Sequence, residues 1–288
     1  MQRHVFRAMG TEVEVMLDLP AGHVTDNAFR GVEAEFGRIE AALSRFLPDS
    51  ELSTLNRRGR VKAGPDLLAT MELALAARAR TGGRFDPTVH DALVAAGYDR
   101  SFEQVPADRA ARNGNGAHSC GGPVEIDRFT RTIELAAGVR LDLGGIGKGY
   151  AVDRAVEKLS RRGPCLVNAG GDVAVRGRRW PVGVETANGF VTLELVSGAL
   201  ATSGSDRRHW RTNGQEQHHL IDPTTGLPSG SDLLRVTVVG SSAAEAEVLA
   251  KSLFLAGAEQ AAAEAERDGV AAVLVTGDGR TVMTGALA

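Results

Sequence analysis

A glycine-rich segment with one lysine is the part of the sequence best suited to bind a phosphate group. It reads Leu141-Asp142-Leu143-Gly144-Gly145-Ile146-Gly147-Lys148-Gly149-Tyr150-Ala151-Val152-Asp153, between a strand-like and a helix-like stretch. Glycines let backbone N–H groups approach a ligand, and a helix N-terminus adds positive potential. The spacing is not that of a Walker A loop, and no βαβ unit surrounds the segment. We expect Lys148 and these glycines to contact phosphate, with a plain turn as the alternative.

A second candidate segment joins a histidine to a rigid acidic turn. His219 precedes Asp222 by three residues, and Pro223 and Gly226 favour a tight turn after it. A curled loop would bring imidazole and carboxylate together, as a proton acceptor or a phosphate contact requires. Three further polar turns are candidate ligand contacts, and each has an ordinary turn as its alternative. They are 83–89 around Asp86-Pro87, 168–172, and 201–206, which contains Ser203.

The elements that must position these segments alternate without a strict βαβ rhythm, which indicates the α+β class with mixed or antiparallel sheets. Apolar periodicity predicts helices at 27–45, 66–80, 151–161, 243–255 and 258–267. It predicts strands at 13–17, 133–135, 139–143, 165–167, 173–176, 182–185, 191–196, 234–239, 271–275 and 281–283. Residues 44–56 are predicted as a loop in which Asp49 and Ser50 signal a helix start. The polar stretch 107–122 is predicted to be a surface insert.

Composition excludes several classes of protein. The 288 residues carry 33 Lys and Arg against 36 Asp and Glu, and 5% are aromatic, which disfavours a nucleic-acid binder. The two cysteines form no CxxC motif, which disfavours zinc and iron–sulfur sites, and we expect Cys165 buried and Cys120 exposed. No apolar run is long enough for a membrane span. Without a recognisable signal peptide or lipobox, the chain is expected to be cytoplasmic.

In their order along the chain, these segments resemble the ApbE family, the FAD:protein FMN transferases. The matching motifs cover nearly the whole chain. They are Met9-Gly10-Thr11, Ser44-Arg45-Phe46, Asp49-Ser50-Glu51-Leu52-Ser53 with Asn56, Phe85-Asp86-Pro87-Thr88-Val89, Asp142 to Asp153, Val167-Asn168-Ala169-Gly170-Gly171-Asp172, Thr202-Ser203-Gly204, and His219-Leu220-Ile221-Asp222-Pro223 through Gly226.

The resemblance implies a single domain over 1–288 with a two-lobed, T-fold-like architecture and FAD in a cleft between the lobes. The implied reaction cleaves FAD, attaches FMN through a phosphoester to a Thr or Ser of a partner flavoprotein, and releases AMP. By analogy, His219, Asp222 and Lys148 are the candidate catalytic residues. The candidate residues for FAD binding are Met9, Phe46, Asp86, Thr88, Asp142, Lys148, Ser203 and Ile221. Phe46 stands where many relatives carry Tyr, which preserves stacking but removes a hydroxyl.

One departure concerns the Mg²⁺ that the family uses. Relatives present an Asp and a Thr four residues apart on a helix, together with a carbonyl of the glycine segment, here Gly145. In this chain Glu247 takes the Asp position and Lys251 the Thr position. An ammonium has no lone pair for a metal. Lys251 would then replace the ion by pairing with Glu247, or the two form a solvated helix pair.

This departure leaves alternatives to protein flavinylation open. One is hydrolysis of FAD, or FMN transfer to a different acceptor. Another is a non-catalytic FAD-binding protein.

Overall fold

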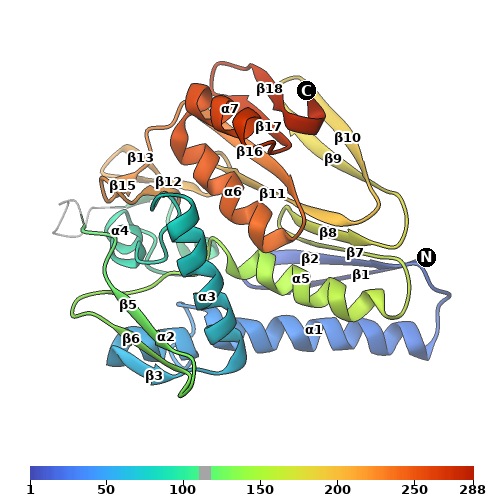
Figure 1. Cartoon of the computed structure of the whole chain (residues 1–288), viewed down its shortest axis with the longest axis horizontal. Coiled ribbons are helices and arrows are strands. Elements are labelled where there is room, and N and C mark those ends of the chain that lie inside the picture. The colour runs from blue at the N-terminus through green and yellow to red at the C-terminus, as the bar shows by residue number, and fades with distance from the viewer. Residues whose placement is uncertain (110–117) are drawn as a thin grey trace. The chain divides into compact units, whose positions relative to one another are not determined.

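The computed structural model describes residues 1–109 and 118–288, which fall into two compact units (Figure 1). Unit 1 comprises residues 1–39, 146–203 and 231–288, and unit 2 comprises residues 40–145 and 204–230. Each unit is therefore built from segments that are distant in sequence. In the described part of the chain, no helix combines the length and the apolar character needed to cross a bilayer.

Helices and strands alternate irregularly along the chain. The helices are α1 (His23–Leu43), α2 (Glu51–Arg58), α3 (Pro65–Arg80), α4 (His90–Ala95), α5 (Gly147–Ser160), α6 (Ala243–Ala256) and α7 (Ala258–Arg267). The strands are β1 (Gln2–Ala8), β2 (Thr11–Leu17), β3 (Arg60–Lys62), β4 (Asp108–Arg109), β5 (Val124–Asp127), β6 (Thr132–Leu135), β7 (Cys165–Ala169), β8 (Asp172–Arg176), β9 (Trp180–Thr186), β10 (Gly189–Leu195), β11 (Gly198–Gly204), β12 (His209–Thr212), β13 (Gln215–His218), β14 (Ile221–Asp222), β15 (Leu227–Pro228), β16 (Leu233–Gly240), β17 (Ala272–Thr276) and β18 (Thr281–Thr284).

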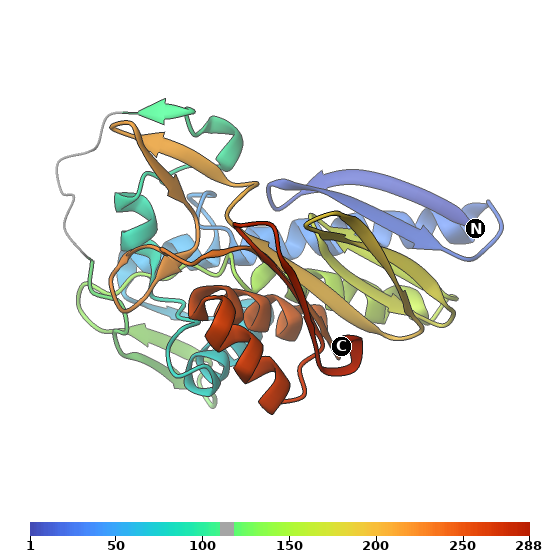
Figure 2. The same cartoon turned by 90° about the horizontal axis from the view of Figure 1, so that it is seen from above.

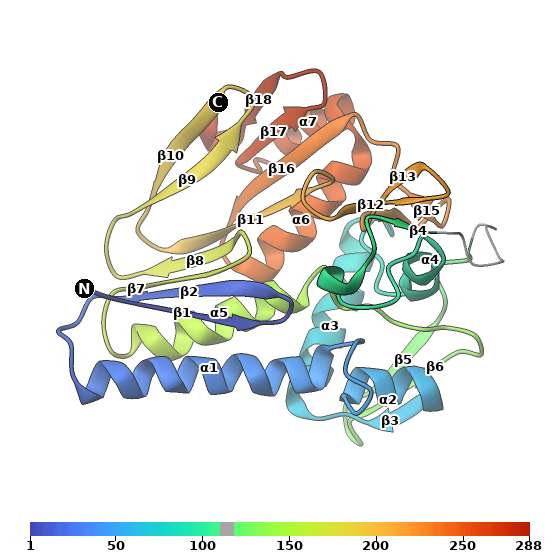
Figure 3. The same cartoon turned by 180° about the vertical axis from the view of Figure 1, so that it is seen from behind.

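Unit 1 is an eight-stranded sheet with helices packed on it. Its strand order is β1-β2-β7-β8-β11-β16-β17-β18. Each of the first four strands in this order is antiparallel to the next. Helix α5 packs on β7 and β8 and α6 packs on β16, while α1 and α5 run beside β1, β2 and β7 in Figure 3. Helix α7 lies against β17 and β18 (Figure 2). The β9–β10 hairpin covers a separate cluster around Trp180, Val175 and Val273.

Unit 2 combines short helices with small sheets. One sheet has the order β3-β6-β5, and another, β13-β12-β4, joins its last two strands in parallel. A cluster around Tyr98, Trp210 and Ile221 forms its aromatic core. Trp210 Nε1 donates to Ala96 O at 2.8 Å, so the buried indole keeps its hydrogen bond.

Most predicted elements are confirmed, and the α+β class with antiparallel sheets holds. The helix predicted at 258–267 coincides with α7, and 66–80 differs from α3 by one residue. Two predictions are wrong. Residues 51–58 form helix α2 within the predicted 44–56 loop, although Ser50 is its N-cap as the start signal indicated.

The second wrong prediction is the strand at 139–143, which is irregular backbone. Leu141 and Leu143 are buried and Val139 is partly buried, but the backbone groups of this segment pair outside any sheet. Asn56 donates to Leu141 O and accepts from Leu141 N, and Asp142 N donates to Pro87 O at 2.8 Å. Hydrogen bonds to the Asn56 side chain and to Pro87 O thus take the place of the strand-to-strand hydrogen bonds that alternation alone predicts.

The predicted insert at 107–122 begins with β4, and residues 110–117 lie outside the described residues. Cys165 is buried as expected. Cys120 was expected to be exposed, but it is half-buried against the aromatic cluster of unit 2.

Candidate functional site

Lys148 lies at the centre of an ionic cluster in unit 1. Helix α5 begins at Gly147, so this lysine belongs to the first helical turn rather than to a loop. Its ammonium donates to Asp172 at the start of β8, and to Glu247 Oε1 on α6 at 2.8 Å. The side chains of Asp172 and Glu247 are only 2% and 6% exposed. Three segments that are far apart in sequence therefore meet at one cation.

The glycines and the aspartate of the motif dock α5 against α6. A Cβ on Gly149 would lie 2.6 Å from backbone atoms of Ala243 and Ala244, a separation no side chain tolerates. The Asp153 carboxylate accepts from Ala243 N at 2.7 Å and Ala244 N at 3.0 Å, and so caps α6. Burial raises the pKa of Asp153, and these two hydrogen bonds oppose the rise. Gly149 and Asp153, which sequence reasoning assigned to a phosphate loop, have this structural task as well.

The position predicted for Mg²⁺ has the wrong donors for a divalent cation. Glu247 Oε1 accepts from Lys148, and Oε2 accepts from Gly149 N at 2.9 Å. Lys251, one helical turn later, offers an ammonium without a lone pair. Gly145 is buried in the turn before α5. Within residues 1–109 and 118–288, no group of three or more His, Cys, Asp or Glu side chains is arranged to hold a metal. The residues present therefore do not fit the family's ion.

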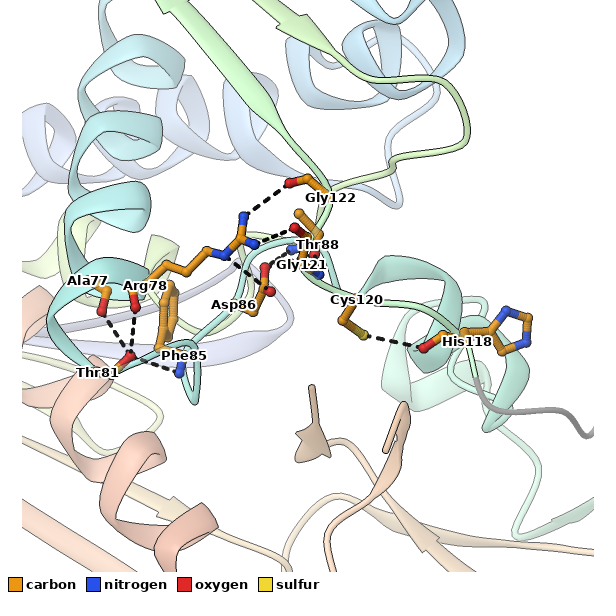
Figure 4. Close-up of polar contacts among 10 residues, drawn as sticks. All are labelled: Ala77, Arg78, Thr81, Phe85, Asp86, Thr88, His118, Cys120, Gly121 and Gly122. Carbon is orange, nitrogen blue, oxygen red and sulfur yellow. Dashed lines mark hydrogen bonds and ion pairs between the residues drawn. The ribbon is translucent and has the colours of Figure 1, made fainter. Parts of the chain in front are cut away.

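A second polar cluster, in unit 2, contains the predicted pair Asp86 and Thr88 (Figure 4). Asp86 Oδ1 accepts from both the backbone N and the hydroxyl of Thr88, each at 2.8 Å. The Thr88 hydroxyl in turn accepts from Gly121 N at 2.7 Å. Arg78 lies 3.4 Å from the Asp86 carboxylate and donates to the carbonyls of Gly121 and Gly122. Asp86 and Thr88 thus hold the segment after residue 118 in place.

Arg45 is a residue that the sequence analysis left without a role. Its side chain is 5% exposed, and its Nε lies 2.5 Å from Asp142 Oδ2. The guanidinium carbon lies 4.2 Å from the centre of the Phe46 ring and 4.7 Å from that of Tyr98. Its Nη2 is buried and has no hydrogen bond to any residue that the structure describes. An unsatisfied buried donor is costly, so a ligand acceptor at this atom would be favourable.

The Arg45 pair changes the interpretation of two predicted residues. Asp142 Oδ1 accepts from Gly144 N at 2.8 Å while Oδ2 faces Arg45, so both carboxylate oxygens are used within unit 2. Phe46 remains 39% exposed and presents a ring backed by a cation. The signal for Arg45 was available in the sequence, because it lies between two motif residues.

In the predicted His219–Asp222 segment, His219 precedes β14 and Asp222 ends it, and a hairpin turn over residues 223–226 joins β14 to β15. Asp222 Oδ1 accepts from Thr224 N and Asp222 O accepts from Gly226 N, both at 2.8 Å. A Cβ on Gly226 would lie 2.2 Å from His118 O, so this turn packs directly on the 118–122 segment. The hydrogen bond between His219 and Asp222 stays a prediction.

His218, which the sequence analysis did not single out, fixes the same loop. Its Nε2 lies 2.9 Å from Ser229 O, and its Nδ1 accepts from Leu220 N. These partners require a neutral ring with the proton on Nε2. Burial lowers the pKa of His218, and the bond to Ser229 opposes that shift.

Cys120 reports on the charge around this loop. Burial raises the pKa of its thiol to about 11, and the carboxylates of Asp86, Asp222 and Asp91 add to the rise. Asp86 and Asp222, which are far apart in the sequence, therefore both lie within electrostatic range of this thiol in unit 2.

The remaining predicted residues lie elsewhere. Met9 is in the β1–β2 turn with a positive φ of 52°, and Ser203 is buried on β11. Ile221 is 4% exposed and packs in the aromatic cluster of unit 2.

The sequence profile described as the ApbE family matches residues 9–274. The chain belongs to the ApbE family. Among curated ApbE relatives, the FAD:protein FMN transferase of Haemophilus influenzae is 28% identical, and the alignment covers 93% of this chain and 84% of that protein. The FAD:protein FMN transferase of Treponema pallidum is 29% identical over 78% of this chain and 70% of its own length.

Solved ApbE structures share the fold over nearly the full length. The crystal structure of the ApbE protein from Thermotoga maritima has a TM-score of 0.84 at 25% identity, covering 98% of this chain and 96% of that one. The apo form of the Pseudomonas stutzeri flavinyl transferase ApbE has a TM-score of 0.82 at 25% identity, covering 98% and 94%. The ApbE architecture therefore extends through both units.

Proposed function

We propose that this chain is an FAD:protein FMN transferase. The observation that carries the proposal is the family match over residues 9–274, together with curated relatives named for that activity along most of their length. The substrates proposed are FAD and a flavoprotein that presents a Thr or Ser hydroxyl.

The proposed transfer is a displacement at the phosphorus of the FMN half of FAD. The acceptor hydroxyl oxygen forms a bond to this phosphorus, and the bond from phosphorus to the bridging oxygen breaks. AMP leaves with the bridging oxygen, and the hydroxyl proton passes to a base, for which His219 is our candidate, with Asp222 as its support. Holding the acceptor in line with the phosphorus supplies the positioning that such a step needs.

The roles of the binding residues follow from the contacts around them. We propose that the exposed Phe46 ring stacks on a planar ring of FAD, while Asp86, Thr88 and Asp142 hold the surrounding backbone. Met9, Ser203, Ile221 and Lys148 complete the proposed set. Because Lys148 already pairs with two carboxylates, its attraction for a diphosphate is weaker than that of an isolated ammonium.

Flavin affinity tests the proposed role of Phe46. We expect Phe46→Ala to lose about 1 to 3 kcal/mol of FAD binding, the range measured for aromatic stacking on bases. Isothermal titration with FAD measures it. Phe129→Ala is the matched control, because that ring is 97% exposed and belongs to none of the motifs. Equal affinities of the Phe46→Ala variant and the control would contradict the assignment.

The altered pair Glu247 and Lys251 favours a second candidate function, in which water or another acceptor replaces the flavoprotein, or FAD binds without reacting. One experiment separates these functions. The protein is incubated with FAD, with and without a flavoprotein that carries the target Thr. A fluorescent acceptor together with AMP supports the transferase. FMN and AMP without labelled protein support the hydrolase, and unchanged FAD supports a binding protein.

A further inference from the structure

The ionic cluster on α5 and α6 has the composition of a site that holds its own cation. We propose that Lys251 takes the place of a divalent ion at this cluster, beside the contact of Lys148 with Glu247, and that its charge excludes the ion from it. The exclusion of the ion does not depend on the proposed function. Its consequence, that FMN transfer proceeds without a metal bound to α6, rests on that function.

The first step in the argument is the use of the Glu247 carboxylate. Each of its oxygens already accepts a hydrogen bond, one from the Lys148 ammonium at 2.8 Å and one from Gly149 N at 2.9 Å. A cation ligated by this carboxylate would have to displace one of these donors. Magnesium also demands near-octahedral oxygen donors, which a carboxylate shared with an ammonium does not supply.

The second step is that Glu247 has little freedom to turn away. Its side chain is 6% exposed, and the α5–α6 contact beneath it allows no Cβ at Gly149. Asp153 fixes the start of α6 through two backbone hydrogen bonds. The position of Glu247 relative to Lys148 is therefore set by the packing of two helices rather than by the salt bridge alone.

The third step is the balance of charge. The carboxylates of Asp172 and Glu247 face one ammonium, Lys148, and a second ammonium follows Glu247 by one turn on the same side of α6. Asp153 adds a third carboxylate and Arg176 a third cation within electrostatic range, so the charges still balance and little net negative charge is left to attract a divalent ion. Lys251 itself offers no oxygen to a metal ion.

Manganese binding tests the proposal without any turnover. Chelator-treated protein is titrated with Mn²⁺, and the electron paramagnetic resonance signal of the free ion reports binding. The variants are Glu247→Asp/Lys251→Thr, which supplies oxygen donors, and Lys158→Thr, which removes one positive charge from a half-exposed position of α5 that pairs with Glu35 on α1. Circular dichroism verifies that each variant is folded. The titration is repeated with FAD, against an FAD blank.

We expect no saturable Mn²⁺ binding to the wild type or to Lys158→Thr, and binding at least about tenfold tighter in the double variant. Saturable binding to the wild type that Glu247→Gln abolishes would overturn the proposal. So would a folded double variant that binds no more Mn²⁺ than the wild type, because Lys251 would then not be what excludes the ion.

The FAD reaction is then repeated with EDTA. If FAD remains intact under every condition, the proposed function fails while the Mn²⁺ result still stands. If flavinylation is lost in EDTA and restored by Mg²⁺, the function stands and the metal-free consequence fails.

Discussion

Replacing Lys148 by Met is expected to destabilise unit 1, because the substitution leaves two buried carboxylates without their shared cation. Asp172 and Glu247 are 2% and 6% exposed, so water cannot take over that role. Removing one partner from a buried ionic group typically costs about 3–5 kcal/mol. At roughly 2 °C or more per kcal/mol, the midpoint of thermal unfolding should fall by at least about 6 °C.

Urea unfolding followed by circular dichroism measures this loss, with Lys158→Met as the matched control. Lys158 lies on the same helix but is 51% exposed, and its variant should change the free energy of unfolding by less than about 1 kcal/mol. The double variant Lys148→Met/Glu247→Gln should recover part of the loss, since one carboxylate is then neutral. Equal losses in Lys148→Met and Lys158→Met, or no recovery, would refute the ionic-cluster reasoning. Lys148→Arg, which keeps the charge, is the variant to use for flavin binding.

Gly149→Ala should lower the free energy of unfolding by about 1–3 kcal/mol in the same urea assay, because its Cβ would lie 2.6 Å from the α6 backbone. Gly144→Ala is the control and should lower it less, because the nearest atom to its Cβ would be a side-chain oxygen at 3.0 Å. In the Cys165→Ser variant, Cys120 is the one remaining cysteine of the sequence. It should react with a thiol reagent at pH 7 at least about 100-fold more slowly than free cysteine, because burial raises its pKa to about 11. Labelling as fast as that of free cysteine would contradict this environment. Since the pKa of His218 is lowered in the folded state, the unfolded state takes up protons first, and stability should decline as the pH falls below about 6.5. The difference between the urea midpoints at pH 7.5 and 5.5 should shrink in His218→Asn but not in the exposed control His209→Asn; part of it should remain, because burial also lowers the pKa of His90.

Patterns within single segments predicted much of the secondary structure. Helix α7 and strand β2 follow from periodicity, because one face of each is more buried than the other. Strands β7, β8 and β17 are buried on both faces and appear in the sequence as short apolar runs. The strand predicted at 139–143 fails for a physical reason. Alternation of apolar and polar residues indicates which residues are buried. Here the backbone of Leu141 forms its hydrogen bonds with the side chain of Asn56, 85 residues earlier, and not with a neighbouring strand.

The sequence by itself indicated the family, because the residue types and order of Asp142 to Asp153, Asp86 to Thr88 and His219 to Gly226 match it, and it predicted these segments as the site. It also determined that position 251 carries an ammonium rather than a hydroxyl. Tertiary structure alone decided that Lys148 is held by Asp172 and Glu247, and that Arg45 lies against Asp142 and Phe46. Local sequence patterns do not predict such contacts, because the contacts depend on how helices and strands that are distant in sequence pack together.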